Sequence, residues 1–490
     1  MPGTHPLRCF GRKVIWMRVL FAASEATPFI KTGGLADVIG SLPREIKNRG
    51  VDVRIILPKY NEIPDAFKQK MNIIKKFTVP FGEQNQGCGI ETLTCEDIVF
   101  YFVDNDQYIK KPKLYGYEDN SERFAFFCKA VLDSLPYLAF KPEIIHSHDW
   151  HTAMISTLLN TQYKNNEFYS NIKTIFTIHN LYYQGIFPRN ILDLFGYSHF
   201  NMEELELHGN VSFMKGALVY SDIITTVSKS YAQEIQTPYY GYNLDRIIKK
   251  RNKDLYGIIN GIDYDEFNPE DNKHIFKTYT SESINNKVIN KLELQKLLGL
   301  SVTNDVPILA IISRLVPQKG LDLISQVLND ILQENLQLVV LGVGQQDYEN
   351  MFKKAASELP DKVSANLTFD EELAHRIYAG ADFLLMPSIF EPCGISQLIA
   401  LRYGTIPIVR ETGGLKDTVG SYGFTFTNIN ALDMLHTVRR AIAYFHNKQE
   451  WARMSKNAME CDNRWSIAAL QYINLYTKLL GGEELVKINT

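Results

Sequence analysis

Two short segments in opposite halves of the chain carry the same pattern of residues suited to binding an anion. The pattern Thr-Gly-Gly-Leu-x-Asp occurs at 32–37 and again at 412–417, and Lys31 precedes the first copy. Each copy is predicted to open a helix, where free backbone N–H groups and the helix dipole favour a phosphate. Lys31 adds a positive charge suited to phosphate or to a negatively charged transition state. Alternatively, these glycines only form the turns between a strand and a helix, as in any α/β protein, and a repeat this short can arise by chance.

Glu391 stands where a carboxylate could hold the hydroxyls of a sugar. It follows the apolar strand predicted at 382–386, in a turn with Pro392, Cys393 and Gly394. Ligands of open α/β sheets bind at the carboxyl ends of the strands. A carboxylate there, beside a loop that can hold phosphate, indicates a sugar nucleotide as the ligand. Cys393 could be a nucleophile, but a small residue whose backbone N–H is used explains it more simply.

Charged side chains also follow the strand predicted at 308–313. Arg314 and Lys319 lie on a proline-containing loop directly after it. Arginine can bind two phosphate oxygens at once and lysine adds a point charge, so this pair suits a diphosphate. Exposed loop charges are the alternative.

Two polar residues in the first half occupy similar positions. Asp149 follows the strand predicted at 144–146, and His179 follows the one at 174–178. Both could contact a reacting sugar. Asp149 could instead cap the helix after it, and a lone histidine is more often structural.

The sequence predicts no metal site and no cofactor. Three histidines and an acid at 146–151 match no zinc-ligand spacing. The acidic triplet at 104–106 is interpreted as a turn, and the glycines at 342 and 344 lack the third glycine of a dinucleotide-binding fingerprint.

The elements that position these residues alternate between strands and helices, which implies parallel sheets in an α/β fold. At 490 residues the chain is too long for one ordinary core, so two large domains are expected. The pattern restarts after a polar run at 241–254. We therefore expect an N-terminal domain over 17–250, a C-terminal domain over 251–464 and a last helical segment over 465–482. Individual expectations include a strand at 366–369 and a helix containing 211–217.

Composition excludes several classes of partner. The net charge of -3 and a pI near 6.4 argue against nucleic acid and anionic membranes. The sequence has no apolar run long enough to span a bilayer. Six scattered cysteines suggest no disulfide framework, so a cytoplasmic location is expected. Residues 1–16 lack the apolar region of a signal peptide and are either a loose extension or precede a natural start at Met17.

Seven segments together, in this order, resemble the bacterial glycogen synthases and plant starch synthases. They cover nearly the whole chain from Met17 onward: KTGGLAD (31–37), HDWH (148–151), IHNLYYQG (178–185), NGID (260–263), SRLVPQKGLDL (313–323), EPCGISQ (391–397) and RETGGLKDTV (410–419). The resemblance implies a GT-B fold: two Rossmann-like parallel-sheet domains facing a deep cleft, with a C-terminal helix returning to the N-domain. It also implies transfer of glucose from a nucleotide-glucose to the non-reducing 4-hydroxyl of an α-1,4-glucan, with retention and without a metal. The family branch favours ADP-glucose over UDP-glucose as donor.

The resemblance also implies roles for the residues already singled out. It places Glu391 on the transferred glucose, Arg314 and Lys319 on the diphosphate, and His179 and Asp149 beside the reacting sugars. Phe369 aligns with an aromatic residue that stacks on the base, where related enzymes often have tyrosine. The residues expected to bind substrate are Lys31, Gly33, Gly34, Asp37, Asn260, Phe369, Cys393, Gly394, Thr412, Gly413 and Gly414.

One departure narrows the family. Relatives in a wider class place a second glutamate eight positions beyond the first, and here that position is Ile399. This favours the glycogen and starch synthase branch over sucrose- or trehalose-making enzymes.

The resemblance implies retention, and no carboxylate other than Asp149 is a credible covalent nucleophile, which favours a front-face mechanism. In it the departing phosphate takes the proton of the acceptor while Arg314 and Lys319 stabilise the developing charge. Two alternatives remain open: a nucleotide-sugar isomerase on the same fold, and a non-catalytic glucan-binding or regulatory protein. A glucan phosphorylase would need a lysine that binds pyridoxal phosphate, and the sequence indicates no lysine for that role.

Overall fold

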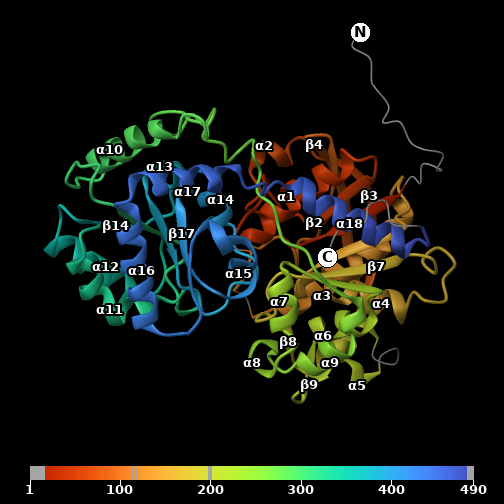
Figure 1. Ribbon diagram of the computed structural model, residues 1–490. Helices are drawn as coiled ribbons and strands as arrows, with labels where there is room; N and C mark the ends of the chain where they lie inside the picture. Colours follow the sequence, from red (N-terminus) through yellow and green to blue (C-terminus); the bar gives the residue numbers. More distant parts are fainter. Residues whose placement is uncertain (1–16, 112–113, 117, 197–200, 483–490) are drawn as a thin grey trace, which may run out of the picture. The chain divides into compact units, whose positions relative to one another are not determined.

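The computed structural model describes residues 17–111, 114–116, 118–196 and 201–482, and the expected extension at 1–16 lies outside them. The chain forms two compact units (Figure 1). The described residues of the first unit fall within Met1–Ile175, Gly185–Asp222 and Tyr472–Thr490. The second unit comprises Phe176–Gln184 and Ile223–Gln471.

The first unit contains strands and helices in alternation, with an antiparallel excursion in the middle. Its elements in chain order are β1 (Arg18–Ala22), α1 (Gly34–Lys47), β2 (Asp52–Pro58), α2 (Asp65–Lys68), β3 (Asn72–Phe81), β4 (Gln84–Cys95), β5 (Ile98–Asp104), α3 (Asn120–Ser134), β6 (Ile144–His148), α4 (Met154–Asn160), β7 (Lys173–Ile178), β8 (Ile186–Phe187), α5 (Met202–Leu205), β9 (Glu206–Leu207), β10 (Asn210–Ser212) and α6 (Phe213–Tyr220).

The main sheet of the first unit has its topological switch point beside β1. The seven strands of this nine-stranded sheet that are named above follow the order β7-β6-β1-β2-β5-β4-β3. β1 pairs in parallel with both β2 and β6, so the chain leaves β1 to one side and later returns to the other. The loops after β1 and β6 therefore leave neighbouring strands at the carboxyl edge of the sheet, where ligands of such sheets bind.

The second unit contains a further series of strands and helices. Its elements are β11 (Ile223–Thr226), α7 (Lys229–Glu234), α8 (Pro238–Gly241), α9 (Asp245–Lys250), β12 (Leu255–Gly257), α10 (Lys287–Leu297), β13 (Ile308–Ile312), α11 (Leu321–Gln333), β14 (Gln337–Leu341), α12 (Gln346–Glu358), β15 (Val363–Asn366), α13 (Glu371–Gly380), β16 (Phe383–Met386), α14 (Ser396–Arg402), β17 (Ile406–Arg410), α15 (Gly413–Val419), β18 (Phe424–Phe426), α16 (Ala431–Phe445), α17 (Lys448–Glu460) and α18 (Trp465–Leu479).

The six-stranded sheet of the second unit is parallel throughout, in the order β15-β14-β13-β16-β17-β18. The chain runs from β13 outward to β15, then crosses back to β16 and continues the other way. The switch point lies between β13 and β16, and the loops after these two strands flank it.

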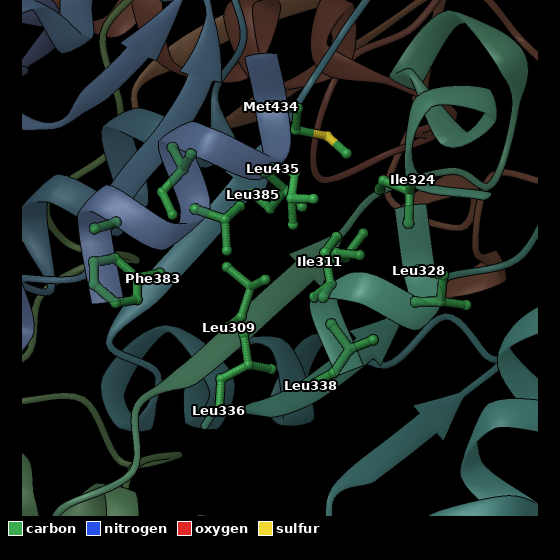
Figure 2. Packing of buried hydrophobic residues seen from close by; sticks show 14 of the residues in the cluster. Leu309, Ile311, Ile324, Leu328, Leu336, Leu338, Phe383, Leu385, Met434 and Leu435 are labelled. Atoms are coloured by element: carbon green, nitrogen blue, oxygen red, sulfur yellow. The ribbon is translucent and has the colours of Figure 1, made fainter. Parts of the chain in front are cut away.

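Helices cover both faces of this sheet, which explains why its strands are apolar on both sides. On one face, side chains of α11, α12 and α16 pack on alternate residues of the strands. Figure 2 shows Leu309 and Ile311 of β13 on this face, with Ile324 of α11 and Met434 of α16. On the other face, Ile308 and Ala310 of β13 pack with residues of α10, α13, α14 and α15. Apolar residues of α11 recur with helical spacing, so one stripe is buried along the whole helix.

The final helix, α18, begins in the second unit and ends in the first. Within the first unit, the Tyr476 hydroxyl lies 2.9 Å from Nδ1 of His146, and both side chains are buried. The His146 ring also lies against that of Tyr472.

Two sequence expectations were wrong in their boundaries. The strand expected at 366–369 is β15, which ends at Asn366, so Phe369 lies on the loop before α13. The helix expected to contain 211–217 begins at Phe213, because residues 210–212 form the short strand β10 and Ser212 caps the helix through its side chain. In both places short apolar runs have no periodicity that separates strand from loop or helix.

In the part of the chain that the structure describes, no helix combines the length and apolar character required to cross a membrane.

Candidate active site

A partly buried ion pair lies at the switch point of the second unit. Nζ of Lys319, on the loop after β13, lies 2.6 Å from Oε2 of Glu391, on the loop after β16. Ser388 also donates its hydroxyl to Oε2 of Glu391, at 2.9 Å. The Glu391 side chain is 8% exposed and that of Lys319 is 18% exposed. The structure thus joins two residues that were predicted separately and that stand 72 positions apart.

The loop that carries Glu391 is shaped by three glycines. Gly394 has φ +76°, a left-handed conformation that other residues rarely adopt. A Cβ atom on Gly413 would lie 2.0 Å from the carbonyl oxygen of Glu391, and one on Gly414 would lie 2.1 Å from that of Cys393. A side chain does not fit at either position of the second Gly-Gly pair, because the backbone there touches the backbone of the Glu391 loop.

The backbone donors predicted in this second copy have protein acceptors in the structure. The Gly414 amide donates to the carbonyl oxygen of Glu391, at 3.1 Å. The Gly413 amide donates to Oε1 of Glu234, at 2.8 Å, and the Thr412 hydroxyl donates to the same atom at 3.1 Å. That these three residues bind the substrate stays a prediction; their visible role is to hold the Glu391 loop.

Helix α7, which sequence reasoning did not single out, binds this loop at several points. Besides the bonds of Glu234, the Ser228 hydroxyl donates to the carbonyl oxygen of Pro392, at 2.6 Å. The Ser230 amide and hydroxyl donate to the carboxylate of Asp417 in α15, at 2.8 and 2.5 Å. The sequence did place polar residues of α7 directly after a predicted strand, as it did for Glu391 and Arg314. No glycine-rich or charged motif for ligand binding stood beside them, so they were not selected.

Arg410, at the end of β17, also supports the loop. It is buried, and its Nε donates to the carbonyl oxygen of Ser388, at 2.8 Å. A buried guanidinium with backbone acceptors fixes the turn before Glu391.

Cys393 and Asn260 meet beneath the same loop. The Asn260 backbone amide donates to the Cys393 sulfur, and burial raises the pKa of this thiol to about 12. A thiol with so high a pKa is not ionised at neutral pH, so Cys393 is a poor nucleophile. This favours its interpretation as a small residue over that as a nucleophile; that its backbone N–H binds substrate stays a prediction.

Arg314 and Phe369 lie exposed beyond the carboxyl ends of β13 and β15. Among the residues that the structure describes, no acidic side chain lies within ion-pair distance of Arg314. Phe369 is 76% exposed, far more than a core residue. An exposed cation and an exposed aromatic ring at one edge suit a phosphate and a planar base.

In the first unit, the predicted residues gather on the loops after β1 and β6. Nζ of Lys31 lies 2.8 Å from Oδ1 of Asp37 in the first turn of α1. Gly33 and Gly34 are exposed, and a Cβ atom on Gly33 would meet nothing within 4 Å. Gly33 therefore borders open space, in contrast to both glycines of the crowded second pair.

Each Thr-Gly-Gly-Leu copy is held by a glutamate that sequence reasoning missed. In the first copy Glu25 accepts hydrogen bonds from the Thr32 amide at 2.6 Å and from the Thr32 hydroxyl at 2.8 Å. In the second copy Glu234 has the same role toward Thr412 and Gly413. Burial raises the pKa of Glu25 to about 7 and also raises that of Glu234.

Asp149 does not cap a helix through its side chain. Its backbone has φ +57°, a conformation uncommon outside glycine that concentrates at functional sites. Tyr115 brings the loops after β1 and β6 together within the first unit: its hydroxyl lies 2.8 Å from that of Ser24, and its ring centroid lies 4.9 Å from that of His151.

His179 is placed with the second unit. Burial lowers its pKa to about 3, so the ring is neutral at physiological pH. Nearby, the Leu181 amide donates to the Tyr231 hydroxyl of α7, at 3.1 Å, which links the segment after β7 to the helix that holds the Glu391 loop.

Within the described ranges, no group of three or more His, Cys, Asp or Glu side chains is arranged to hold a metal ion.

Comparison with known proteins identifies the family. A sequence profile described as the starch synthase catalytic domain matches residues 18–250, and one described as glycosyl transferases group 1 matches residues 300–460. The glycogen synthase of Desulforamulus reducens is 54% identical over 475 residues, which are 95% of this chain and 99% of that protein. That of Alkaliphilus metalliredigens is 54% identical over 474 residues, covering 94% of this chain and 100% of that protein.

Two solved structures resemble this chain. The catalytic domain of starch synthase IV from Arabidopsis thaliana, bound to ADP and acarbose, matches with a TM-score of 0.88 and 32% identity, covering 95% of this chain and 100% of that one. Sucrose-phosphate synthase from Thermosynechococcus elongatus matches with a TM-score of 0.61 at 16% identity, which shows a shared fold alone.

These matches confirm the predicted family and the α/β fold class of the GT-B type. They support neither a nucleotide-sugar isomerase nor a non-catalytic glucan-binding protein. Two sequence profiles, nearly full-length relatives and a solved structure show that the chain belongs to the glycogen and starch synthases, the glycosyltransferases that add glucosyl units to an α-glucan.

Proposed function

We propose that this enzyme transfers glucose from ADP-glucose to the 4-hydroxyl at the non-reducing end of an α-1,4-glucan, with retention of configuration. ADP as the nucleotide is supported by the Arabidopsis starch synthase, which was solved with ADP and acarbose. The observation that carries the site assignment is the partly buried Lys319–Glu391 ion pair at the switch point of the second sheet.

The pair and its surroundings suit a donor sugar and its diphosphate. Glu391, nearly buried and bonded to Ser388, offers carboxylate oxygens to the hydroxyls of the transferred glucose. Lys319 neutralises charge on the leaving diphosphate, and the exposed Arg314 adds a bidentate contact. Phe369 stacks on the adenine through its exposed ring.

The family resemblance assigns roles in the same reaction to Lys31 and Asp149 of the first unit and to His179 of the second. Lys31, ion-paired to Asp37 beside the open Gly33, contacts the donor phosphates. Asp149, held in its left-handed conformation, lies beside the reacting sugar. His179 is neutral and contacts the glucose through hydrogen bonds, not through a positive charge.

In this mechanism the departing phosphate oxygen accepts the proton of the acceptor hydroxyl on the same face of the sugar. The C–O bond to the leaving group breaks as the new glycosidic bond forms. Lys319 and Arg314 stabilise the negative charge that develops on the diphosphate. A cytoplasmic location is part of the proposal, supported by the scattered cysteines of the sequence.

The test is nucleotide release from ADP-glucose and from UDP-glucose, each with and without added glycogen. Release of ADP that depends on glycogen, with growth of the glucan, is expected. Preferential use of UDP-glucose would overturn the donor assignment. Release from neither donor would overturn the proposed reaction.

A further inference from the structure

The backbone of Asp149 has a conformation that its surroundings must hold. Its φ is +57° and its ψ is 177°, a combination that is almost confined to glycine. A residue with a Cβ atom adopts it only at a cost in free energy, and only where the surrounding structure fixes it. The side chain of Asp149 makes no capping hydrogen bond to the following helix. Other residues must therefore hold this turn.

The segments before and after Asp149 are both fixed within the first unit. Before it, at the end of β6, the buried ring of His148 stacks on that of His146, with centroids 4.2 Å apart. After it, the ring of Trp150 is so close to Gly185 that a Cβ atom on that glycine would lie 2.5 Å from the ring. Asp149 thus connects two segments that cannot easily move, and its backbone takes up the difference in direction between them.

Thr152 binds the backbone on both sides of Asp149. Its hydroxyl oxygen accepts a hydrogen bond from the His148 amide, at 2.7 Å, and donates to the carbonyl oxygen of His148, at 2.9 Å. The Thr152 amide donates to the carbonyl oxygen of Asp149, at 3.1 Å, and the Thr152 hydroxyl lies 3.3 Å from the same atom. The orientations of these two peptide groups set φ and ψ of Asp149, so Thr152 holds both angles.

Burial makes the Thr152 hydroxyl difficult to replace. The side chain is completely buried, so bulk water does not reach the backbone groups that it binds. Without the hydroxyl, the His148 amide would lose this acceptor inside the protein, which is unfavourable. Relaxation of the turn would then remove both the unpaired amide and the strain. As φ of Asp149 becomes negative, its Cβ atom and carboxylate turn to another side of the chain.

We propose that Thr152 is a positioning residue for Asp149, whose carboxylate it keeps directed at the reacting sugar. The inference rests on the proposed function, which places Asp149 beside that sugar. Thr152 itself contacts no substrate in this proposal. Loss of its hydroxyl should therefore lower kcat but leave the KM for ADP-glucose unchanged, because Arg314 and Lys319 of the second unit are not affected.

The experiment compares Thr152→Val, which keeps the shape of the side chain without the hydroxyl, with Thr152→Ser, which keeps the hydroxyl. The kcat of Thr152→Val should fall about ten- to a hundredfold, because a displacement of about 1 Å can cost a catalytic group about a hundredfold in rate. Thr152→Ser should retain most of the activity. In an Asp149→Asn background, Thr152→Val should cause little further loss, because the two residues act as a unit.

The matched control is Thr157→Val. Thr157 belongs to α4, shortly after the same turn, and is also completely buried. Among the residues that the structure describes, its hydroxyl has no hydrogen-bond partner. The same substitution should therefore leave kcat unchanged at this position. Thermal unfolding of each variant shows whether the fold is intact.

A second readout does not depend on activity. Hydrogen–deuterium exchange measured by mass spectrometry reports the protection of the His148 amide in peptides that span residues 144–154. Exchange there should be faster in Thr152→Val than in the wild type, and unchanged in Thr157→Val. If the wild type transfers no glucose but this difference persists, the proposed reaction is refuted, whereas the role of Thr152 in holding Asp149 is not.

Three results would overturn the positioning role. They are wild-type kcat in Thr152→Val, equal losses of kcat in Thr152→Val and Thr152→Ser, and a loss of full size when Thr152→Val is added to Asp149→Asn. Unchanged exchange of the His148 amide in Thr152→Val would refute the structural basis of the proposal.

Discussion

Removing the carboxylate of Glu234 should impair catalysis although this side chain contacts no substrate in our proposal. Its Oε1 accepts hydrogen bonds from the Gly413 amide at 2.8 Å and from the Thr412 hydroxyl at 3.1 Å. The next residue, Gly414, donates to the carbonyl oxygen of Glu391. Glu234 therefore holds the start of α15, and α15 holds the catalytic loop.

The magnitude follows from the contacts. A hydrogen bond to a charged group contributes about 1.5–3 kcal/mol. Because Glu234 is only partly buried, we discount the two bonds together to about 2–3 kcal/mol for Glu234→Ala. Displacement of a catalytic group by about 1 Å can cost about a hundredfold in rate. We therefore expect kcat/KM of Glu234→Ala to fall by about ten- to a hundredfold.

The assay compares Glu234→Ala with Glu234→Gln, whose amide oxygen can accept the same two hydrogen bonds. The glutamine variant should stay within about threefold of the wild type, because both hydrogen bonds can be kept and the attraction of the charge to the N-terminus of α15, about 0.5 kcal/mol, is lost. Glu358→Ala is the control: Glu358 is an exposed residue at the end of α12, 3.8 Å from Lys354. Wild-type activity in Glu234→Ala, or equal losses in both Glu234 variants, would refute the positioning role.

Three further predictions concern the assigned residues. Lys319→Ala and Glu391→Ala should each lower kcat by at least about a hundredfold while circular dichroism stays native, because each removes a charge that acts on the transition state; activity near that of the wild type would contradict the assignments. Phe369→Ala should raise the KM for ADP-glucose about tenfold without lowering the thermal midpoint, since the ring is 76% exposed, whereas Phe369→Tyr should leave it unchanged. Burial raises the pKa of Glu25 from 4.5 to about 7, so the folded protein keeps a proton that the unfolded chain releases between these values. Urea titrations should therefore show that the unfolding free energy of the wild type falls, relative to that of Glu25→Gln, by up to about 3 kcal/mol as the pH rises from about 4.5 through about 7. A difference between the two proteins that does not vary with pH would contradict this.

Several features of the site could be predicted because they depend on local sequence. Arg314, Lys319 and Glu391 were found by one rule, polar residues directly after apolar strands. In a parallel sheet the carboxyl ends of all strands share one edge, so residues found in this way converge without knowledge of the strand order. The pairing of Lys319 with Glu391 additionally required that β13 and β16 be neighbours, which the strand order of the folded sheet decides.

The two glutamates that hold the Thr-Gly-Gly-Leu copies could not be predicted. Glu25 precedes its threonine by seven positions, whereas Glu234 lies 178 positions before Thr412. The two glutamates have no common spacing from the threonines that they bind, because the folded structure decides which carboxylate lies at each helix start. The boundary of β15 was misplaced for a related reason: the apolar character of residues 366–369 includes an exposed aromatic ring, which the sequence does not distinguish from a buried one.

Sequence by itself determined the succession of strands and helices, the parallel α/β class and the family, since periodicity, turn residues and family motifs are local. Only the tertiary structure decided what the two identical Gly-Gly pairs do. Gly33 borders open space, whereas Gly413 and Gly414 are pressed against the backbone of the Glu391 loop. The difference arises because steric contact and hydrogen bonding depend on distances of a few ångströms between segments far apart in the chain, and those distances exist only once the sheet has brought its loops to one edge.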